Sequence, residues 1–118
     1  MKLVIEGTLC TLNEYINEER THKYRASKIK KQETNKCIIY AKNQLQPITD
    51  IPVNVVCDWY TTGRKDPDNI AFGIKFILDG LVKAEMLAND GHKQINSIHH
   101  NFYVDKENQR VEVEFKGV

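Results

Sequence analysis

The residues best suited to metal binding or catalysis lie in one short segment, Asp66-Pro67-Asp68-Asn69. Two carboxylates two residues apart, with an amide oxygen beside them, can offer several oxygen ligands to a hard cation. Mg²⁺ is commonly bound by one or two carboxylates together with water and the phosphate oxygens of a substrate. The same tetrapeptide also fits a helix start, because proline is favoured at the first helical position and Asp or Asn at the cap. Taken alone, the segment favours helix capping.

More charged residues follow this segment at helical spacing. Apolar residues recur at Ile70, Ile74, Ile77, Leu78 and Leu81. This spacing predicts one helix over about residues 69–85 with an apolar stripe facing a core. On a regular helix, Lys75 and Asp79 would each lie within about 20° of Asp68, so the three would form one narrow row on the opposite side. Such a row is either a solvated face with a Lys75–Asp79 pair or the wall of a cleft. Asn89-Asp90-Gly91, which follows, is typical of an ordinary turn.

Taken together, these segments resemble the RusA family of Holliday junction resolvases. Members carry a D-x-D-N motif flanked by Arg or Lys, a helix with K…D-[AG]-L, and a closing D-D or N-D turn. The matching segments here are Arg64-Lys65-Asp66-Pro67-Asp68-Asn69, Lys75-Phe76-Ile77-Leu78-Asp79-Gly80-Leu81 and Asn89-Asp90-Gly91. The resemblance covers about residues 53–115. It extends weakly to Thr11-Leu12-Asn13-Glu14-Tyr15, where the family often has an N-x-x-Y-type segment.

The resemblance implies a homodimeric endonuclease that requires Mg²⁺, with Mn²⁺ able to substitute, and that cuts four-way DNA junctions. Asp66, Asp68 and Asp90 match the carboxylates that bind the metal and act in catalysis, and Lys75 matches the active-site lysine. Asp79 and Asn69 match possible supporting residues. The Asp68–Lys75 gap is longer than the family's usual pattern by about one helical turn. This insertion would keep Lys75 on the same face but displace it by about 5 Å.

We expect Asp66, Asp68 and Asp90 to form one cluster, with Asp79 outside it. Asp90 must then fold back toward the other two carboxylates or come from a second subunit. Hydrolysis of a phosphodiester needs an activated water and neutralised charge at phosphorus, both of which a carboxylate-held Mg²⁺ supplies. Lys75 would add a local cation for the phosphate or the transition state.

Positive charge is concentrated between residues 20 and 42, where eight Lys or Arg residues face a single Glu33. The remaining residues carry six net negative charges, which leaves the formal net charge of +1 for the chain. Such a basic segment is typical of a phosphate-binding surface, although a solvated helix face has the same composition. The candidate DNA-binding residues are Arg20, Lys23, Arg25, Lys28, Lys30 and Lys31, together with Arg64 and Lys65 beside the carboxylates.

Two other functions fit these residues. One is a nucleic-acid-binding dimer without catalytic activity, in which residues 66–69 only cap a helix. The other is a metal-dependent nuclease acting on flaps, nicks or RNA. A histidine metal site is not expected, because His99 and His100 are adjacent in a predicted strand and point to opposite faces. Trp59, Tyr60, Phe102 and Tyr103 are expected in the core or at a sheet edge.

The elements that position these residues follow from the periodicity of the chain. Strands are predicted at residues 2–6, 53–60, 94–104 and 110–115, the last two as a hairpin. Helices are predicted at 12–20, 22–45 and 69–85, and Pro47 prevents the second from continuing. The order β-α(α)-β-α-β-β predicts an α+β two-layer sandwich with two main helices on a four-stranded mixed sheet. Residues 1–118 would form a single RusA-like endonuclease domain.

Composition narrows the class of protein further. The near-zero net charge of the 118 residues excludes a uniformly basic polyanion binder. No apolar run approaches the ~18 residues of a membrane span, and the N-terminus lacks a signal-peptide pattern. Three widely spaced cysteines, Cys10, Cys37 and Cys57, do not suggest a disulfide framework. These features predict a cytoplasmic protein, in a bacterium or a phage-infected cell, with no membrane partner.

Overall fold

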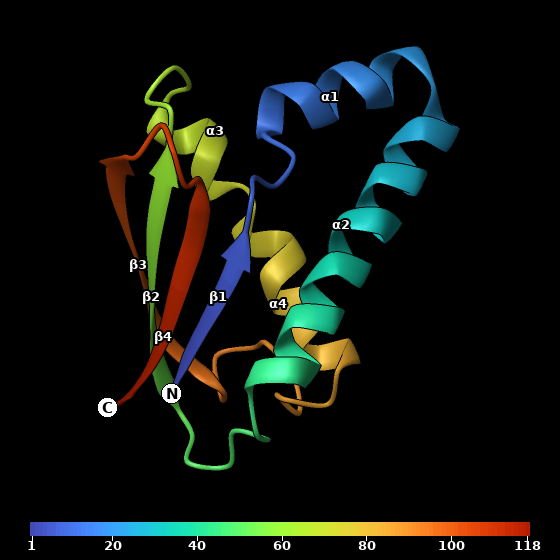
Figure 1. The fold of residues 1–118 in the computed structure, drawn as a ribbon. Coiled ribbons are helices and arrows are strands. Elements are labelled where there is room, and N and C mark those ends of the chain that lie inside the picture. The colour runs from blue at the N-terminus through green and yellow to red at the C-terminus, as the bar shows by residue number, and fades with distance from the viewer.

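A four-stranded mixed sheet, packed on one side by helices, organises the computed structural model of residues 1–118 (Figure 1). The strands are β1 (Lys2–Glu6), β2 (Val53–Thr61), β3 (Ile95–Val104) and β4 (Arg110–Gly117), in the spatial order β1-β4-β2-β3. The helices are α1 (Leu12–Thr21), α2 (Lys23–Gln44), α3 (Pro67–Ala71) and α4 (Ile74–Lys83). The predicted α+β class, the four-stranded mixed sheet and the two main helices are confirmed.

Strand β2 lies in the interior of the sheet, and its alternate side chains are buried. Val53, Val55, Cys57 and Trp59 all lie on the helix-facing side with at most 4% of their surface exposed. β2 pairs antiparallel with β4 and parallel with β3. The parallel partner requires the chain to cross from one end of the sheet to the other between β2 and β3. Helices α3 and α4 make that crossing.

The predicted helix over 69–85 is wrong as a single element, because the chain turns at Phe72 and Gly73 between α3 and α4. Gly73 packs directly on the indole of Trp59, where an added Cβ would lie 2.8 Å from Trp59 Cη2. Glycine is therefore required at this turn for steric reasons, and it also weakens helical continuity. Asp68 and Lys75 consequently lie on different helices. The single helix on which Asp68, Lys75 and Asp79 were expected to form a charged row is therefore not present.

The predicted hairpin of the last two strands is also wrong. β3 and β4 do not pair with each other, because β2 lies between them. The polar connection at residues 105–109 passes over the carboxyl end of β2, and Asp105 N–H donates to the Thr61 carbonyl at 2.8 Å. β2 buries one face against the helices and bonds along both of its backbone edges, which leaves β3 at the edge of the sheet.

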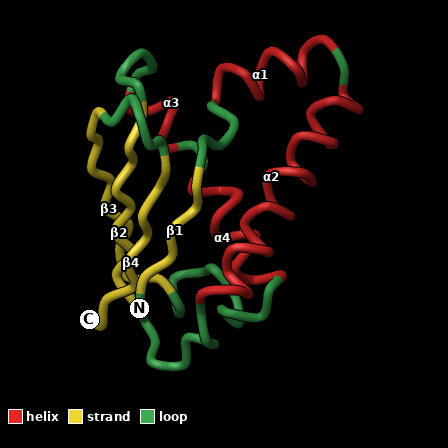
Figure 2. The backbone as a smooth tube through the Cα atoms, in the orientation of Figure 1, coloured by secondary structure: helices red, strands yellow, loops and turns green.

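Within the helix layer, α2 and α4 pack closely against each other. Gly80 of α4 lies against Cys37 of α2, so that an added Cβ at residue 80 would lie 2.6 Å from Cys37 Cβ. Phe76, Ile77 and Leu81 of α4 are fully buried around this contact. None of the helices combines the length and apolar character needed to cross a membrane. Figure 2 shows most of the loops at the two ends of the sheet, whereas the link between α1 and α2 lies at the tip of the helices.

We predict that Gly80→Ala destabilises the protein by roughly 1–3 kcal/mol, because the new methyl group forces α2 and α4 apart. Denaturant unfolding followed by circular dichroism measures this loss. Gly117→Ala is the matched control, since an added Cβ there meets no atom within 4 Å. Equal unfolding free energies for both variants would contradict the close approach of the two helices.

Candidate active site

Asp66 and Asp68 lie where the chain leaves the carboxyl end of β2 and enters α3, and both are exposed. Asp66 occupies the cap position of α3, but its carboxylate makes no capping hydrogen bond. Asp68 Oδ1 accepts one local bond, from Asn69 N–H at 2.9 Å. Neither carboxylate takes part in an ion pair. Capping therefore does not occupy these carboxylates, which remain open to a ligand.

The segment around Asn13 lies directly beside the carboxylates, although it is more than fifty residues away in sequence. Asn69 Oδ1 accepts the backbone N–H of Asn13 at 3.1 Å, and Lys65 Nζ contacts Glu14 Oε1 at 3.0 Å. The rings of Tyr15 and Phe72 pack with centroids 5.5 Å apart. One of the segments that carry the family resemblance thus meets its weak extension at residues 11–15 in the fold. Asn69 joins α3 to the first turn of α1.

The first turn of α1 is rigidly built. Thr11 and Glu14 form a reciprocal capping box, in which each side chain bonds the other residue's backbone N–H. Burial alone would raise the pKa of Glu14, but hydrogen bonds from Lys65 and Thr11 outweigh it and lower that pKa. The Lys65 ammonium is therefore directed to Glu14 rather than outward, whereas the exposed Arg64 makes no ion pair. Of these two candidate DNA contacts, Arg64 is the one that is free.

A polar residue of α2 anchors the loop that leads into this turn. Glu33 Oε2 accepts the backbone N–H of Cys10 at 2.7 Å, and Lys36 Nζ contacts the Thr8 carbonyl at 3.4 Å. Glu33 interrupts the apolar pattern of its helix, and the fold supplies the reason: its carboxylate positions residues 8–11. Sequence reasoning missed this role, because the signal is a polar residue at an otherwise buried position.

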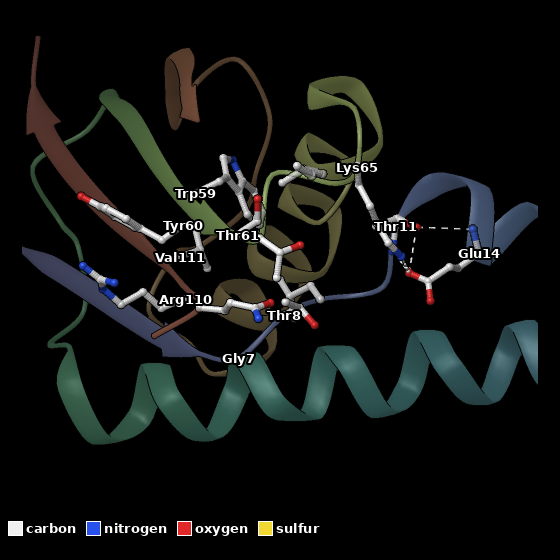
Figure 3. A pocket seen from close by; sticks show the side chains of 14 residues that line it. Gly7, Thr8, Thr11, Glu14, Trp59, Tyr60, Thr61, Lys65, Arg110 and Val111 are labelled. Carbon is white, nitrogen blue, oxygen red and sulfur yellow. Dashed lines mark hydrogen bonds and ion pairs between the residues drawn. The ribbon is translucent and has the colours of Figure 1, made fainter. Parts of the chain in front are cut away.

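A cavity of about 160 Å³ opens next to the carboxylates, between the start of α1 and the carboxyl end of β2 (Figure 3). Its lining includes Thr11, Glu14 and Lys65 on one side and Thr61 and Arg110 on the other. Asp66 and Asp68 do not line it. The cavity thus adds polar groups beside the carboxylate pair without enclosing it.

Asp90 lies at the other end of the sheet from Asp66 and Asp68. The two carboxylates follow the last residue of β2, whereas Asp90 precedes the first residue of β3, and these strands are parallel (Figure 1). The nine residues of β2 span about 26 Å. No group of three His, Cys, Asp or Glu side chains in the chain is arranged to hold a metal ion. The expected cluster of Asp66, Asp68 and Asp90 is therefore not formed within one chain.

Lys75 and Asp79 lie together on α4, with Lys75 Nζ 3.7 Å from Asp79 Oδ2. This is the i, i+4 pair expected from the spacing. Lys75 is about half exposed, so its ammonium remains accessible to solvent. The acidic side chain also acts electrostatically on the Cys37 thiol of α2, whose pKa burial raises to about 12. Asp79 is thus engaged within the helix layer.

The basic residues named from the sequence lie on a helical arm formed by the end of α1 and the first half of α2 (Figure 1). All six are exposed: Arg20, Lys23, Arg25, Lys28, Lys30 and Lys31. One weak ion pair, between Arg25 and Glu18 at 3.9 Å, engages the arm. The arm rises at the same end of the molecule as α3. Positive charge and the open carboxylate pair therefore share one end.

His100 has a structural partner. Its Nδ1 accepts the indole N–H of Trp59 at 2.9 Å, and the two rings stack. Burial, with a smaller contribution from neighbouring His99, lowers the pKa of His100. Tyr60 lies on the open face under the Arg110 guanidinium, 3.8 Å from the ring centroid, and Trp59 is in the core. The cysteines Cys10, Cys37 and Cys57 are all free thiols.

Comparison with protein-family models and with curated proteins finds no match to this chain.

We predict that the stability of the fold decreases as the pH falls below about 6.5, through the protonation of His100. The folded-state pKa lies below the ordinary value of 6.5, so the unfolded chain binds this proton first. Stability is therefore lost between pH 6.5 and the lowered folded-state pKa. Thermal unfolding measured across this range should show a shallower decline for His100→Gln, which keeps an acceptor for Trp59.

His92→Gln is the control, because His92 is exposed in a loop and makes no side-chain hydrogen bond. Its profile should follow that of the unmodified protein. An unchanged slope in His100→Gln would show that another group causes the decline.

Proposed function

We propose that this protein is a Mg²⁺-dependent endonuclease that resolves four-way DNA junctions, as its resemblance to the RusA family implies. The observation that carries the proposal is the meeting of Asp66 and Asp68 with the segment around Asn13. These two parts of the resemblance lie side by side, joined by the Asn69–Asn13 hydrogen bond, and leave both carboxylates unpaired. A helix cap alone requires neither the distant segment nor free carboxylates.

The donor set suits Mg²⁺ or Mn²⁺. Asp66 and Asp68 are hard oxygen ligands on a short helix, and Mg²⁺ needs one or two carboxylates with water and substrate phosphate completing its shell. A bound ion would lower the pKa of the attacking water and neutralise charge at phosphorus. Asp66 and Asp68 hold the ion in this proposal. Lys75, accessible beside Asp79, supplies a positive charge to the phosphate.

Asp90 joins this site from the second subunit of a homodimer. The sheet holds it at the wrong end to reach Asp66 and Asp68 of its own chain. A two-fold dimer provides two such sites in symmetric positions, which suits a junction that needs two opposed cuts. The subunit interface thereby becomes part of the catalytic site.

In this proposal the basic arm binds the phosphate backbone of the DNA. Its six exposed cations lie at the same end as the carboxylates, and the open carboxylate pair is the place where a phosphate would be cut. Contacts between cations and phosphates release counterions, so binding should weaken steeply as salt concentration rises. The arm positions the DNA backbone and carries no sequence preference by itself.

We predict that Asp68→Asn abolishes Mg²⁺-dependent cleavage of a synthetic four-way junction while junction binding is retained. The substitution removes the charge that holds the cation, and loss of a direct metal ligand should cost at least as much as the roughly 10–100-fold lost when a residue that supports a ligand is removed. Gel assays of cleavage and binding, with and without Mg²⁺, measure both properties. Asp50→Asn is the matched control, because Asp50 is equally exposed in a loop and outside the site.

The same assay separates the alternatives when it includes a flap and a linear duplex of the same sequence. Paired symmetric nicks on the junction support the resolvase. Preferential cleavage of the flap would identify a different nuclease. Junction binding without any cleavage by the unmodified protein would identify a binding module.

We also predict that two inactive variants, Asp68→Asn and Asp90→Asn, recover activity when they are unfolded and refolded together. In a mixed dimer, one site combines intact Asp66 and Asp68 of one chain with intact Asp90 of the other. About one quarter of the wild-type number of sites should return, as single nicks rather than paired cuts. Asp66→Asn mixed with Asp68→Asn is the control and should stay inactive. Recovery in neither mixture would show that Asp90 does not act across the interface.

A further inference from the structure

The outer edge of β3 is the least protected edge of the sheet. Its ten residues include no Asp, Glu, Lys, Arg or Pro. Four of the chain's eight exposed large apolar side chains lie on this one strand: Ile98 (40% exposed), Phe102 (38%), Tyr103 (45%) and Val104 (64%). A long edge strand with unpaired backbone groups and no charged residues tends to pair with another strand. Nothing in the sequence of β3 opposes such pairing.

The opposite edge of the sheet is guarded. β1 is only five residues long, and it begins and ends with the charged residues Lys2 and Glu6. The side-chain amide of Gln44 bonds the outer backbone of β1, donating to the Val4 carbonyl and accepting from the Val4 N–H, both at 2.8 Å. Short length and charged side chains are among the devices by which proteins prevent edge pairing, and the Gln44 amide here covers backbone groups of the edge as well. This chain applies them at one edge and omits them at the other.

The helix layer also stops short of β3. Ile98, His100 and Phe102 are in register with Val55, Cys57 and Trp59, so they lie on the helix-facing side of the sheet. The β2 members of these pairs are buried, whereas Ile98 and Phe102 stay exposed. An apolar row therefore continues the core surface beyond the helices, next to the open backbone edge.

We propose that β3 is the dimer interface, pairing antiparallel with β3 of a second copy across a two-fold axis. A two-fold axis brings the same strand of both copies together in opposite directions, so each backbone edge meets its own complement. The strand carries no charge that would repel its copy. Strand pairing alone buries less than the ~1,200–2,000 Å² of a stable interface, so the apolar row around Ile98 and Phe102 must be covered as well.

The choice of a second copy, rather than an unrelated strand, rests on the proposed function. β3 begins near Asp90 and ends beside the carboxyl end of β2, which leads to Asp66 and Asp68. Antiparallel pairing places the beginning of one β3 against the end of the other. Asp90 of each copy then lies at the end of the molecule where the other copy holds Asp66 and Asp68. Carboxylates that lie at opposite ends of the sheet within one chain therefore lie at the same end when they come from different copies.

The experiment measures oligomeric state by light scattering and sedimentation, without DNA or metal. The unmodified protein should have about twice the 13.7 kDa mass of one chain. Ile98→Lys combined with Phe102→Lys should yield a monomer with an unchanged far-ultraviolet circular dichroism spectrum. His99→Lys, an exposed position at the middle of β3, is the second variant, because it places two like charges near the axis and should weaken the dimer without touching the apolar row.

Ile39→Lys is the matched control, since Ile39 is 60% exposed on α2, away from β3, and its variant should remain dimeric. The proposal is overturned if the unmodified protein is monomeric, if both β3 variants remain dimeric, or if Ile39→Lys dissociates the dimer instead. A dimer that depends on β3 but has no nuclease activity would contradict the proposed function alone. If the protein cleaves junctions but both β3 variants remain dimeric, the proposed interface is wrong and the proposed function is not contradicted.

Discussion

The parallel pairing of β2 with β3 is the constraint on which the rest of the structure depends. A parallel pair obliges the chain to leave one end of the sheet and return to the other before the second strand begins. Here α3 and α4 make that return, so the residues that follow β2 and those that precede β3 are held about one strand length apart. Asp66 and Asp68 fall on the first side of this crossing and Asp90 on the second. In this fold the two sides of the crossing therefore cannot share one metal ion within a single chain.

The same crossing determines what gathers around Asp66 and Asp68. Because α3 begins where β2 ends, it lies against the first turn of α1, and Asn69 reaches the backbone of Asn13. The loop before α1 is held in turn by Glu33 of α2. A chain of hydrogen bonds thus connects the long helix, the α1 turn and the carboxylate pair. The basic arm, an extension of α1 and α2, is fixed at this end by the same contacts. The net charge of +1 is the sum of a positive segment at residues 20–42 and a negative remainder.

The regular elements could be predicted from the sequence because their signal is local. The alternation in β2 and β4 and the spacing along α2 appear in the structure with nearly the predicted bounds. The break at Phe72 and Gly73 could not be predicted, because the close packing of Gly73 against Trp59 is a contact with a distant strand. The pairing of β3 was misjudged for a related reason. A short polar connection normally indicates a hairpin, but the connection at 105–109 spans a third strand. Within the site, the types of the residues were visible in the sequence, whereas the contact of Asn13 with Asn69 was not.

The difference between the two sheet edges bears on why β3 remains unprotected. An exposed edge strand promotes aggregation. At β1 the side-chain amide of Gln44 occupies the backbone N–H and C=O of Val4 and so prevents pairing there. β3 has no such protection, and a partner strand that pairs with this edge would explain its absence. A partner that pairs antiparallel also reverses the direction of the strand that separates the carboxylates. The strand that prevents the site from closing within one chain is thus the strand that can close it between two. In such an arrangement, cutting would depend on dimerisation, and a lone chain bound to DNA through its basic arm would leave the backbone intact.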